Sequence, residues 1–194
     1  MPDFTADKEN SIQWAKSILN NDEWCIFDSE TTGLGINSQI IQVGIITDSG
    51  EEWQSFVKPT ISISQEATEI HGITFEDVEE APYFEQVFID LWKVVKNRSV
   101  IIFNAENELK FIRQSMRARG IQIAFPTSDK RKCRIFSNGG SIHCAMQMYS
   151  QYMGEWNEQY GNYKWQKLPG GDHSALGDCK ATLELIKKMA ESNI

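Results

Sequence analysis

The stretch that decides the fold is WCIFDSETTGLG, residues 24–35. Its first four residues, 24–27, are apolar and predict a strand buried on both faces. Asp28 and Glu30 follow at once, although an unpaired charge in a buried strand costs several kcal/mol. Because alternate side chains of a strand point to the same face, the two carboxylates converge on one point. Paired carboxylates of this kind are suited to holding a divalent cation.

Length and charge limit the kind of protein. The chain has 194 residues and a formal net charge of −8, which predicts one domain over residues 1–194 with its core at about 22–191. The acidic balance argues against gripping long duplexes, but not against holding a strand end through metal ions. With no leader-like N-terminus and no apolar run of membrane-spanning length, we expect a cytoplasmic protein with no membrane partner. The four cysteines show no metal-ligand spacing and are expected to be reduced core residues.

Apolar periodicity predicts an alternation of helices and strands. We expect strands at about 24–27, 39–47, 52–57, 99–103 and 133–136, and helices at about 9–19, 65–71, 83–96, 105–119, from 141 onward, and 174–191. Residues 48–50 (Asp-Ser-Gly) are typical of a hairpin turn, so the first three strands form an antiparallel meander. The fold class is therefore α/β: a mixed five-stranded sheet, with a meander plus parallel strands, flanked by helices.

Two further acids and a histidine interrupt apolar helix faces. Glu108 borders the apolar stripe of its helix, and Asp178 lies in a largely apolar row of the last helix. His173 precedes that helix, and residues 169–171 (Pro-Gly-Gly) free it to turn toward the acids. Each feature alone is more often a solvated edge or a cap. Together they place four acids and a histidine at the ends of one strand and two helices that pack on the same sheet.

Four segments carry a resemblance to a known family. FDSETTGLG (27–35), HGIT (71–74), FNAENELKFI (103–112) and HSALGDCKAT (173–182) resemble the motifs of the DEDDh, or DnaQ-like, exonucleases, which include proofreading subunits and ribonuclease T. The resemblance implies a ribonuclease H-like fold and two Mg²⁺ or Mn²⁺ ions. It also implies 3′→5′ hydrolysis of a single-stranded end, DNA favoured and RNA allowed, with release of nucleoside 5′-monophosphates.

The same resemblance assigns roles to individual residues. Asp28 would bridge both metals, Glu30 and Asp178 would complete one metal site, and Glu108 would support the second. His173 would be the general base that deprotonates the attacking water. The terminal nucleotide would be bordered by Thr31, Leu34, His71 and Asn104. Family relatives form homodimers or bind a polymerase, and the sequence leaves both alternatives open.

The second motif departs from the family pattern NAxFD, because Asn107 and Glu108 replace Phe and Asp. The additional methylene moves the carboxylate, which matters for an octahedral ion. We expect a water-bridged ligand to accommodate it. The alternative is a catalytically weakened domain that binds nucleic-acid ends or a protein. A zinc hydrolase built from His71, His143 and the cysteines lacks ligand spacing.

Two other patterns have a structural and a functional interpretation. Aromatic residues recur at steps of three and four along a helix predicted through Tyr149, Tyr152, Trp156, Tyr160 and Tyr163. Core packing is favoured over base stacking for them. Two basic groups are candidates for phosphate contacts or for a solvated face: Lys130, Arg131, Lys132 and Arg134, and Arg113, Arg117 and Arg119.

Overall fold

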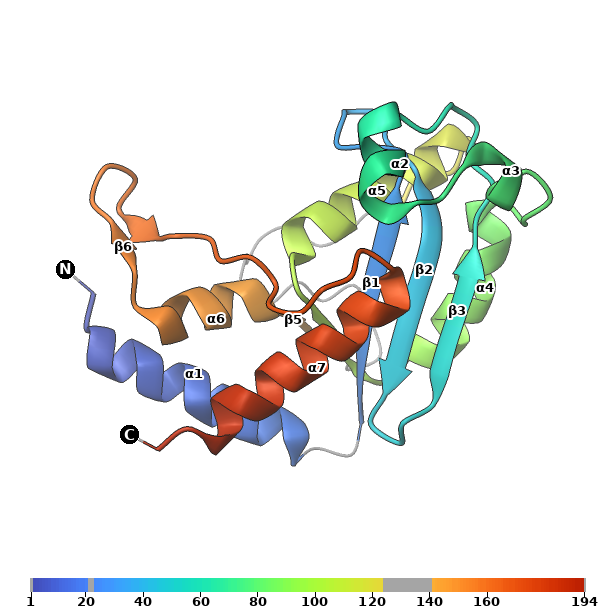
Figure 1. Cartoon of the computed structure of the whole chain (residues 1–194). Helices are drawn as coiled ribbons and strands as arrows, with labels where there is room; N and C mark the ends of the chain where they lie inside the picture. The colour runs from blue at the N-terminus through green and yellow to red at the C-terminus, as the bar shows by residue number, and fades with distance from the viewer. Residues whose placement is uncertain (1, 21–22, 124–140, 194) are drawn as a thin grey trace.

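A five-stranded mixed sheet forms the centre of the computed structural model, which describes residues 2–20, 23–123 and 141–193 (Figure 1). The strand order is β3-β2-β1-β4-β5. The strands are β1 Trp24–Thr31, β2 Ile40–Thr47, β3 Glu52–Phe56, β4 Ser99–Ile102 and β5 Ile142–Cys144. The first three form an antiparallel meander, whereas β4 runs parallel to β1 and β5 parallel to β4. The predicted ribonuclease H-like sheet is thereby confirmed.

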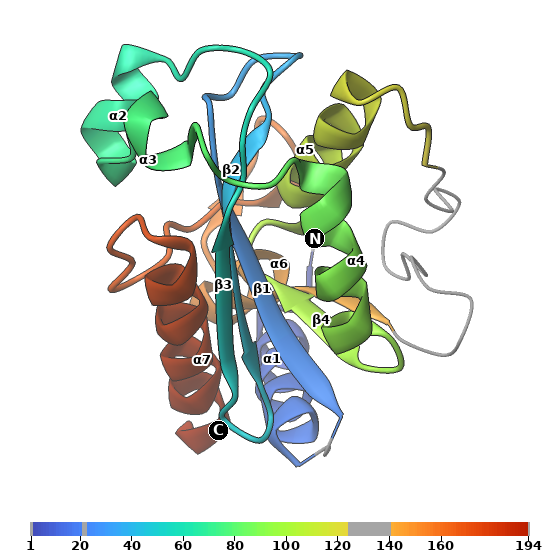
Figure 2. The same cartoon turned by 90° about the vertical axis from the view of Figure 1, so that its right-hand side faces the viewer.

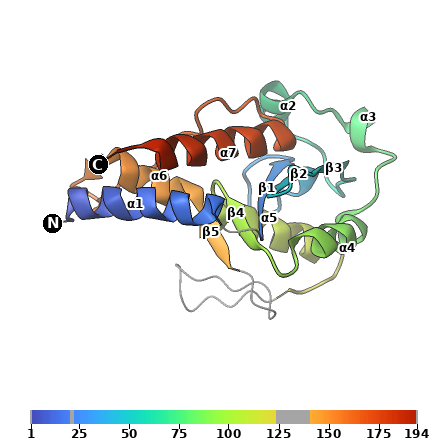
Figure 3. The same cartoon turned by 90° about the horizontal axis from the view of Figure 1, so that it is seen from below.

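Helices cover both faces of this sheet. They are α1 Phe4–Leu19, α2 Gln65–His71, α3 Phe75–Val78, α4 Phe84–Val95, α5 Ala105–Ala118, α6 Ala145–Met153 and α7 Ala175–Glu191. Figure 2 shows α7 on one side of the sheet and α4 on the other. From below, α1, α6 and α7 form one layer, and α4 and α5 lie across the sheet from it (Figure 3). Within the described residues, no helix has the length and apolar character needed to cross a membrane.

Alternation along β1 divides the core into two clusters. Cys25 and Phe27 pack with α4 and α5, while Trp24 and Ile26 pack with α1, α6 and α7. All four side chains are buried, at 6% exposure or less. Strand β1 is thus buried on both faces, as its run of apolar residues predicts. Its even-numbered positions, which include Asp28 and Glu30, face the α7 layer.

Two predicted boundaries are wrong, one because of a local helix cap and the other because of pairing with a distant strand. Helix α1 begins at Phe4 instead of residue 9, because the carboxylate of Asp3 accepts the Ala6 N–H and caps an earlier start. The helix predicted from 141 begins only at Ala145, because residues 142–144 pair with β4 as an edge strand. The strand predicted at 133–136 lies outside the described residues.

The helix predicted through the aromatic stripe is also wrong. Helix α6 ends at Met153, since Gly154 takes a left-handed conformation with φ 72°. A two-stranded hairpin follows, made of β6 Trp156–Asn157 and β7 Asn162–Tyr163. The short helix α3 was not anticipated either. The predicted core packing holds for Tyr149 and Tyr152, which pack against the core cluster shared by α1, α6 and α7, but it is wrong for Tyr160, which is 70% exposed at the tip of the hairpin.

Candidate metal centre

Strand β1 carries its two acids inside the strand. It continues through both acids to Thr31, so Asp28 and Glu30 share one face near the end of the strand, as the sequence predicts. Its parallel partner β4 is paired only as far as Ile26. Beyond that point the edge of β1 has no β4 neighbour, and helix α5 begins there after Asn104. The acids lie where a helix terminus can approach the sheet.

The neighbouring strand β2 places the start of α7 over these acids. Gly44 lies opposite Asp28 in the register, and a Cβ atom there would be 2.5 Å from the backbone of Ala175 and Leu176. Only glycine allows this approach without a shift of the helix. Gln42, opposite Glu30, accepts the Ala175 N–H through Oε1 at 2.9 Å. Neither residue is among the predicted site residues, although a glycine inside a strand signals a close backbone approach.

The loop before α7 is held by one carboxylate. Oδ1 of Asp178 accepts the backbone N–H groups of Asp172 at 3.0 Å and His173 at 3.2 Å. Ser174 caps the helix, because its Oγ accepts the Gly177 N–H at 3.1 Å. These bonds fix the position of Asp178 in the first turn of α7.

As a result, three of the predicted ligands meet. Asp28, Glu30 and Asp178 each offer a carboxylate oxygen, and these oxygens lie within 4.8 Å of one another. Ligands on opposite sides of one hard divalent cation are separated by about 4–5 Å, so the spacing fits such an ion. In the part of the chain that the structure describes, no lysine or arginine forms an ion pair with these three acids.

The electrostatics of the cluster favour protons in the absence of a cation. Burial raises the pKa of Asp28 well above its usual value, and the charges of Glu108, Asp178 and Glu30 raise it further. Burial, followed by the charges of Asp178 and Glu108, raises the pKa of Glu30 to about 8. Burial also raises the pKa of Asp178. A divalent cation would replace these protons and satisfy the same oxygens.

Glu108 is near the cluster but is not one of the three converging residues. It is buried, with 7% of its surface exposed, and Ser29 donates its hydroxyl to Oε2. Burial raises the pKa of Glu108 to about 8. Ser29 alternates with Asp28 along β1, so its side chain lies on the α5 face of the sheet. The role of Ser29 had no signal in the sequence, because the bond joins residues far apart in the chain.

His173 lies directly before α7, as the Pro-Gly-Gly stretch predicts. Its backbone is left-handed, with φ 61°, a conformation that is uncommon for a residue with a side chain. Burial raises the pKa of Asp178 and lowers the pKa of His71. The charge of His173 adds a smaller lowering effect to both pKa values. The imidazole is thus within electrostatic reach of the carboxylate cluster.

The residues predicted to contact the nucleotide differ in exposure and in hydrogen bonding; they are Thr31, Leu34, His71 and Asn104. Nδ1 of His71 accepts the Ile73 N–H at 3.0 Å, which leaves the proton on Nε2 to donate to the Thr31 carbonyl at 3.2 Å. Burial lowers the pKa of His71. Leu34 is 79% exposed. Asn104 precedes α5 as its N-cap. His71 therefore ties α2 to the end of β1, beside the carboxylates.

The zinc-hydrolase alternative finds no support in the described residues. His143 accepts a hydrogen bond from Trp14 Nε1 at 3.2 Å through Nδ1 and bonds to Ser141 through Nε2 at 2.7 Å. Cys25 and Cys179 are buried and unpaired. Across residues 2–20, 23–123 and 141–193, the one group of three or more potential ligands is the acidic one. The basic group at residues 130–134 lies outside the described residues.

Comparisons with known proteins agree with the geometry. The family model RNase_T, described as Exonuclease, matches residues 25–186. A protein of Escherichia phage 186 named uncharacterized exonuclease CP81 is 34% identical over 191 residues, covering 92% of this chain and 93% of that protein. DNA polymerase III subunit epsilon of Buchnera aphidicola subsp. Schizaphis graminum is 32% identical over 116 residues, 53% of this chain and 50% of that protein.

Solved structures share the fold. Exonuclease X in complex with 5′ overhanging duplex DNA superimposes with a TM-score of 0.54 at 24% identity, covering 87% of this chain and 92% of that one. E. coli exonuclease I in complex with a dT13 oligonucleotide gives a TM-score of 0.65 at 16% identity, covering 88% and 41%. The nuclease domain of 3′hExo, described as a DEDDh family member bound to rAMP, gives 0.55 at 18% identity, covering 90% and 96%.

Proposed function

The chain belongs to the exonuclease family whose model spans residues 25–186, and from this premise we propose that it is a divalent-metal-dependent 3′→5′ exonuclease. The substrate is a single-stranded nucleic acid, with DNA favoured over RNA, and the products are nucleoside 5′-monophosphates. The polarity and the products follow from the resemblance of its motifs to DEDDh exonucleases. The preference for a single strand is supported by the shared fold with exonuclease I, whose structure holds a dT13 oligonucleotide.

The observation that carries this proposal is the convergence of three carboxylates within 4.8 Å. Asp28, Glu30 and Asp178 would hold the metal, Mg²⁺ or Mn²⁺. Two such ions, when bound, would stabilise the attacking and the leaving oxygen of an in-line displacement. Glu108 would contribute from the α5 side, through water, to the second ion. Carboxylate oxygens are the ligands that both Mg²⁺ and Mn²⁺ prefer.

His173 would serve as the general base. One of its imidazole nitrogens would take the proton of the attacking water, because the unprotonated nitrogen of a neutral imidazole is a proton acceptor. The hydrogen bond from its backbone N–H to Asp178 at 3.2 Å keeps the residue beside the carboxylates. Its side chain is exposed, so it can reach water and then release the proton to solvent.

The terminal nucleotide would lie against the rim formed by β1, α2 and the start of α5. Leu34, which is 79% exposed, offers an apolar surface for a base. Thr31 and His71, which are joined by a hydrogen bond at 3.2 Å, would border the nucleotide, and Asn104, the N-cap of α5, would border it as well. Few contacts of this set read a base edge, so little sequence preference is expected.

The test uses single strands labelled at the 5′ end, as DNA and as RNA of the same sequence, in Mg²⁺, Mn²⁺ or EDTA. The proposal predicts a ladder that shortens from the 3′ end in either metal and disappears in EDTA. Chromatography of the products should give 5′-monophosphates. Shortening from the labelled end, or release of 3′-monophosphates, would contradict the proposed polarity or chemistry.

A second candidate function follows from the hydrogen bond between Ser29 and Glu108. Because that bond turns Oε2 of Glu108 toward β1, the site could be weakened and the domain could bind nucleic-acid ends or a protein without efficient cleavage. Glu108→Asp separates the two candidates. A rate within about tenfold of wild type supports the enzyme. A gain of a hundredfold or more would support the weakened site.

Partners and location stay predictions. The chain spans 13% of the PolC-type DNA polymerase III of Caldanaerobacter subterraneus subsp. tengcongensis, with which it is 26% identical, and 50% of the Buchnera epsilon subunit. Size-exclusion chromatography of the purified chain tests the proposed homodimer, and the same measurement on a mixture of the chain with a polymerase tests the proposed association. The single domain and the cytoplasmic location expected from the sequence are likewise untested.

A further inference from the structure

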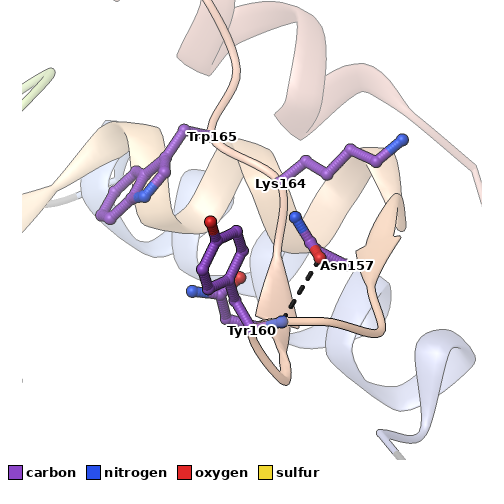
Figure 4. A pocket seen from close by; sticks show the side chains of 5 residues that line it. Asn157, Tyr160, Lys164 and Trp165 are labelled. Atoms are coloured by element: carbon purple, nitrogen blue, oxygen red, sulfur yellow. Dashed lines mark hydrogen bonds between the residues drawn. The ribbon is translucent and has the colours of Figure 1, made fainter.

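The β6–β7 hairpin and the coil that follows it expose two aromatic side chains. Tyr160 is 70% exposed and Trp165 is 60% exposed. Together with Asn157, Asn162 and Lys164 they line a pocket of about 370 Å³ (Figure 4), a volume within the usual range for small-ligand sites of about 300–1,000 Å³. This pocket shares no residue with the carboxylate cluster.

One face of the hairpin is anchored to α1. The rings of Trp156 and Tyr163 meet edge to face at 5.2 Å, and each also meets Phe4 edge to face, at 6.4 and 6.0 Å. The hydroxyl of Tyr163 donates to Asp7 at 2.6 Å. Since side chains alternate along a strand, the adjacent asparagines of both strands face the other way. The face of the hairpin that carries the pocket is therefore turned away from α1.

The turn that carries Tyr160 is also fixed. Oδ1 of Asn157 accepts the backbone N–H groups of Gln159 at 3.1 Å and Tyr160 at 3.3 Å. Gly161, with φ 61°, donates its N–H to the Asn157 carbonyl at 2.9 Å. The backbone of Lys164 adds a further bond to Glu155 at 2.8 Å. The exposed ring is thus presented on an ordered backbone, which reduces the entropy lost on binding.

The coil after the hairpin offers basic side chains beside the pocket. Residues 164–171 include Lys164 and Lys167 and no acid, whereas the acids Glu155 and Glu158 lie on the hairpin side, in a chain whose net charge is −8. Lys164 has an ion pair with Glu155 at 3.5 Å, but both side chains are about half exposed, at 54% and 48%. Exposed pairs of this kind contribute little, so Lys164 can exchange its partner for a phosphate.

We propose that this pocket is a stacking platform for upstream bases of the single strand whose 3′ end lies in the carboxylate cluster; the proposal rests on the proposed function and adds a second contact region to it. Bases stack on Tyr160 and Trp165, with Asn157 and Asn162 also lining the pocket, and Lys164 contacts a phosphate. Aromatic stacking of this type tolerates any base sequence, as a trimming exonuclease requires.

The chain itself connects the platform to the cluster. The coil after β7 runs directly to the start of α7 (Figure 1). Eight peptide units separate Trp165 from His173, so their Cα atoms lie at most about 29 Å apart at ~3.6 Å per residue. A stacked trinucleotide spans only about 10 Å and a dodecamer about 40 Å, at ~3.4 Å per nucleotide. Of the two oligonucleotides, only the dodecamer is longer than the largest possible distance between the platform and the carboxylate cluster.

The experiment measures binding without turnover, by fluorescence anisotropy of 5′-labelled dT3 and dT12. All proteins carry Asp28→Asn and are kept in EDTA, so neither the substrate nor the metal changes during the measurement. In this background we compare Tyr160→Ala and Trp165→Ala with the controls Tyr160→Phe and Trp165→Phe, which keep an aromatic ring. The alanine variants should weaken dT12 binding by about tenfold each. The phenylalanine variants should bind as the background protein does, and dT3 binding should not change.

Equal dT12 affinity for the alanine variants and the background protein would overturn the platform. So would an equal loss for dT3 and dT12, because that pattern indicates a general disturbance of the fold. Failure of the proposed function gives a different result: wild-type protein would then leave both oligonucleotides intact in Mg²⁺ and Mn²⁺. Binding and turnover therefore report separately on the two proposals.

Discussion

At the scale of single residues, the carboxylate cluster makes stability depend on pH and metal. The pKa values of Glu30 and Glu108 are raised to about 8 from a usual value of 4.5. The folded state therefore binds protons more tightly than the unfolded chain does. This contribution is fully present below about pH 4 and is lost as the pH rises through about 8. In EDTA, the melting temperature should fall between about pH 5 and pH 9.

Magnesium should reverse this loss. Because the ligands must be deprotonated, Mg²⁺ should raise the melting temperature more at about pH 8.5 than at pH 5.5. Differential scanning fluorimetry checks both effects. Asp28→Asn should remove the Mg²⁺ shift, while Asp90→Asn, an exposed acid of α4, should keep it. A melting temperature in EDTA that rises with pH would contradict the clustered acids.

The hydroxyl of Ser29 matters because it bonds a buried carboxylate. Ser29→Ala would leave Glu108 without this donor, and the free energy of unfolding should fall by about 1–3 kcal/mol. The pKa of Glu108 should rise further, since the bond from Ser29 lowers it. Urea unfolding measures the change, with Ser29→Thr as the control that keeps the hydroxyl. An equal loss in Ser29→Thr would indicate packing in place of the hydrogen bond.

At the scale of elements, Gly44 determines how closely α7 approaches the sheet. Gly44→Ala would place a Cβ atom 2.5 Å from the backbone of α7, so the helix must move. We expect a loss of about 1–3 kcal/mol in the free energy of unfolding, as in overpacked cores. Because Asp178 moves with the helix, the affinity for Mn²⁺ should fall as well.

Isothermal titration with Mn²⁺ and urea unfolding test this pair of effects together. Gly35→Ala is the matched control, because a Cβ atom there would meet its nearest neighbour, Ser38, at 3.6 Å, an ordinary contact. If Gly44→Ala kept wild-type stability and Mn²⁺ affinity, the close approach of α7 would not be what positions Asp178.

Local patterns predicted most elements, and the misses have physical reasons. The buried strand β1 and the helix α2 follow from the apolar pattern, and in the structure Ser64 and Gly72 cap α2 at the predicted ends. Strand β5 has three residues and exists because it pairs with β4, a contact between distant parts of the chain. The hairpin was mistaken for a helix because its aromatic residues recur at helical steps. Gly154 and Gly161 were the overlooked signals.

The acidic residues of the site could be predicted from the sequence, but the contacts that position them could not. Asp28, Glu30 and Asp178 could be named because acids interrupt apolar patterns, and their convergence could be expected from a shared sheet. Gly44 and Gln42 place α7 through tertiary contacts: the glycine inside a strand signals a close approach but not its partner, and Gln42 leaves no local pattern. The orientation of Glu108 toward Ser29 has the same origin.

At the scale of the whole molecule, a protein with a net charge of −8 repels the phosphates of a nucleic acid, so we expect only a few phosphate contacts. Each phosphate contact on a single strand contributes about −0.7 to the slope of log K against log salt concentration. Replacing Lys164 by alanine should therefore reduce the steepness of this slope by about 0.7 for dT12. Anisotropy titrations at several salt concentrations measure it. An unchanged slope would contradict the phosphate contact of Lys164.

The central claim is that Asp28, Glu30 and Asp178 form the metal centre at which nucleic acid is cleaved. Its most direct test is the cleavage rate of 5′-labelled dT12 in Mg²⁺ by three proteins: wild type, Asp28→Asn and Asp90→Asn. The account predicts loss of a thousandfold or more for Asp28→Asn, and an unchanged rate for Asp90→Asn. A rate for Asp28→Asn close to wild type would contradict the account, because the cluster could not then be the catalytic centre.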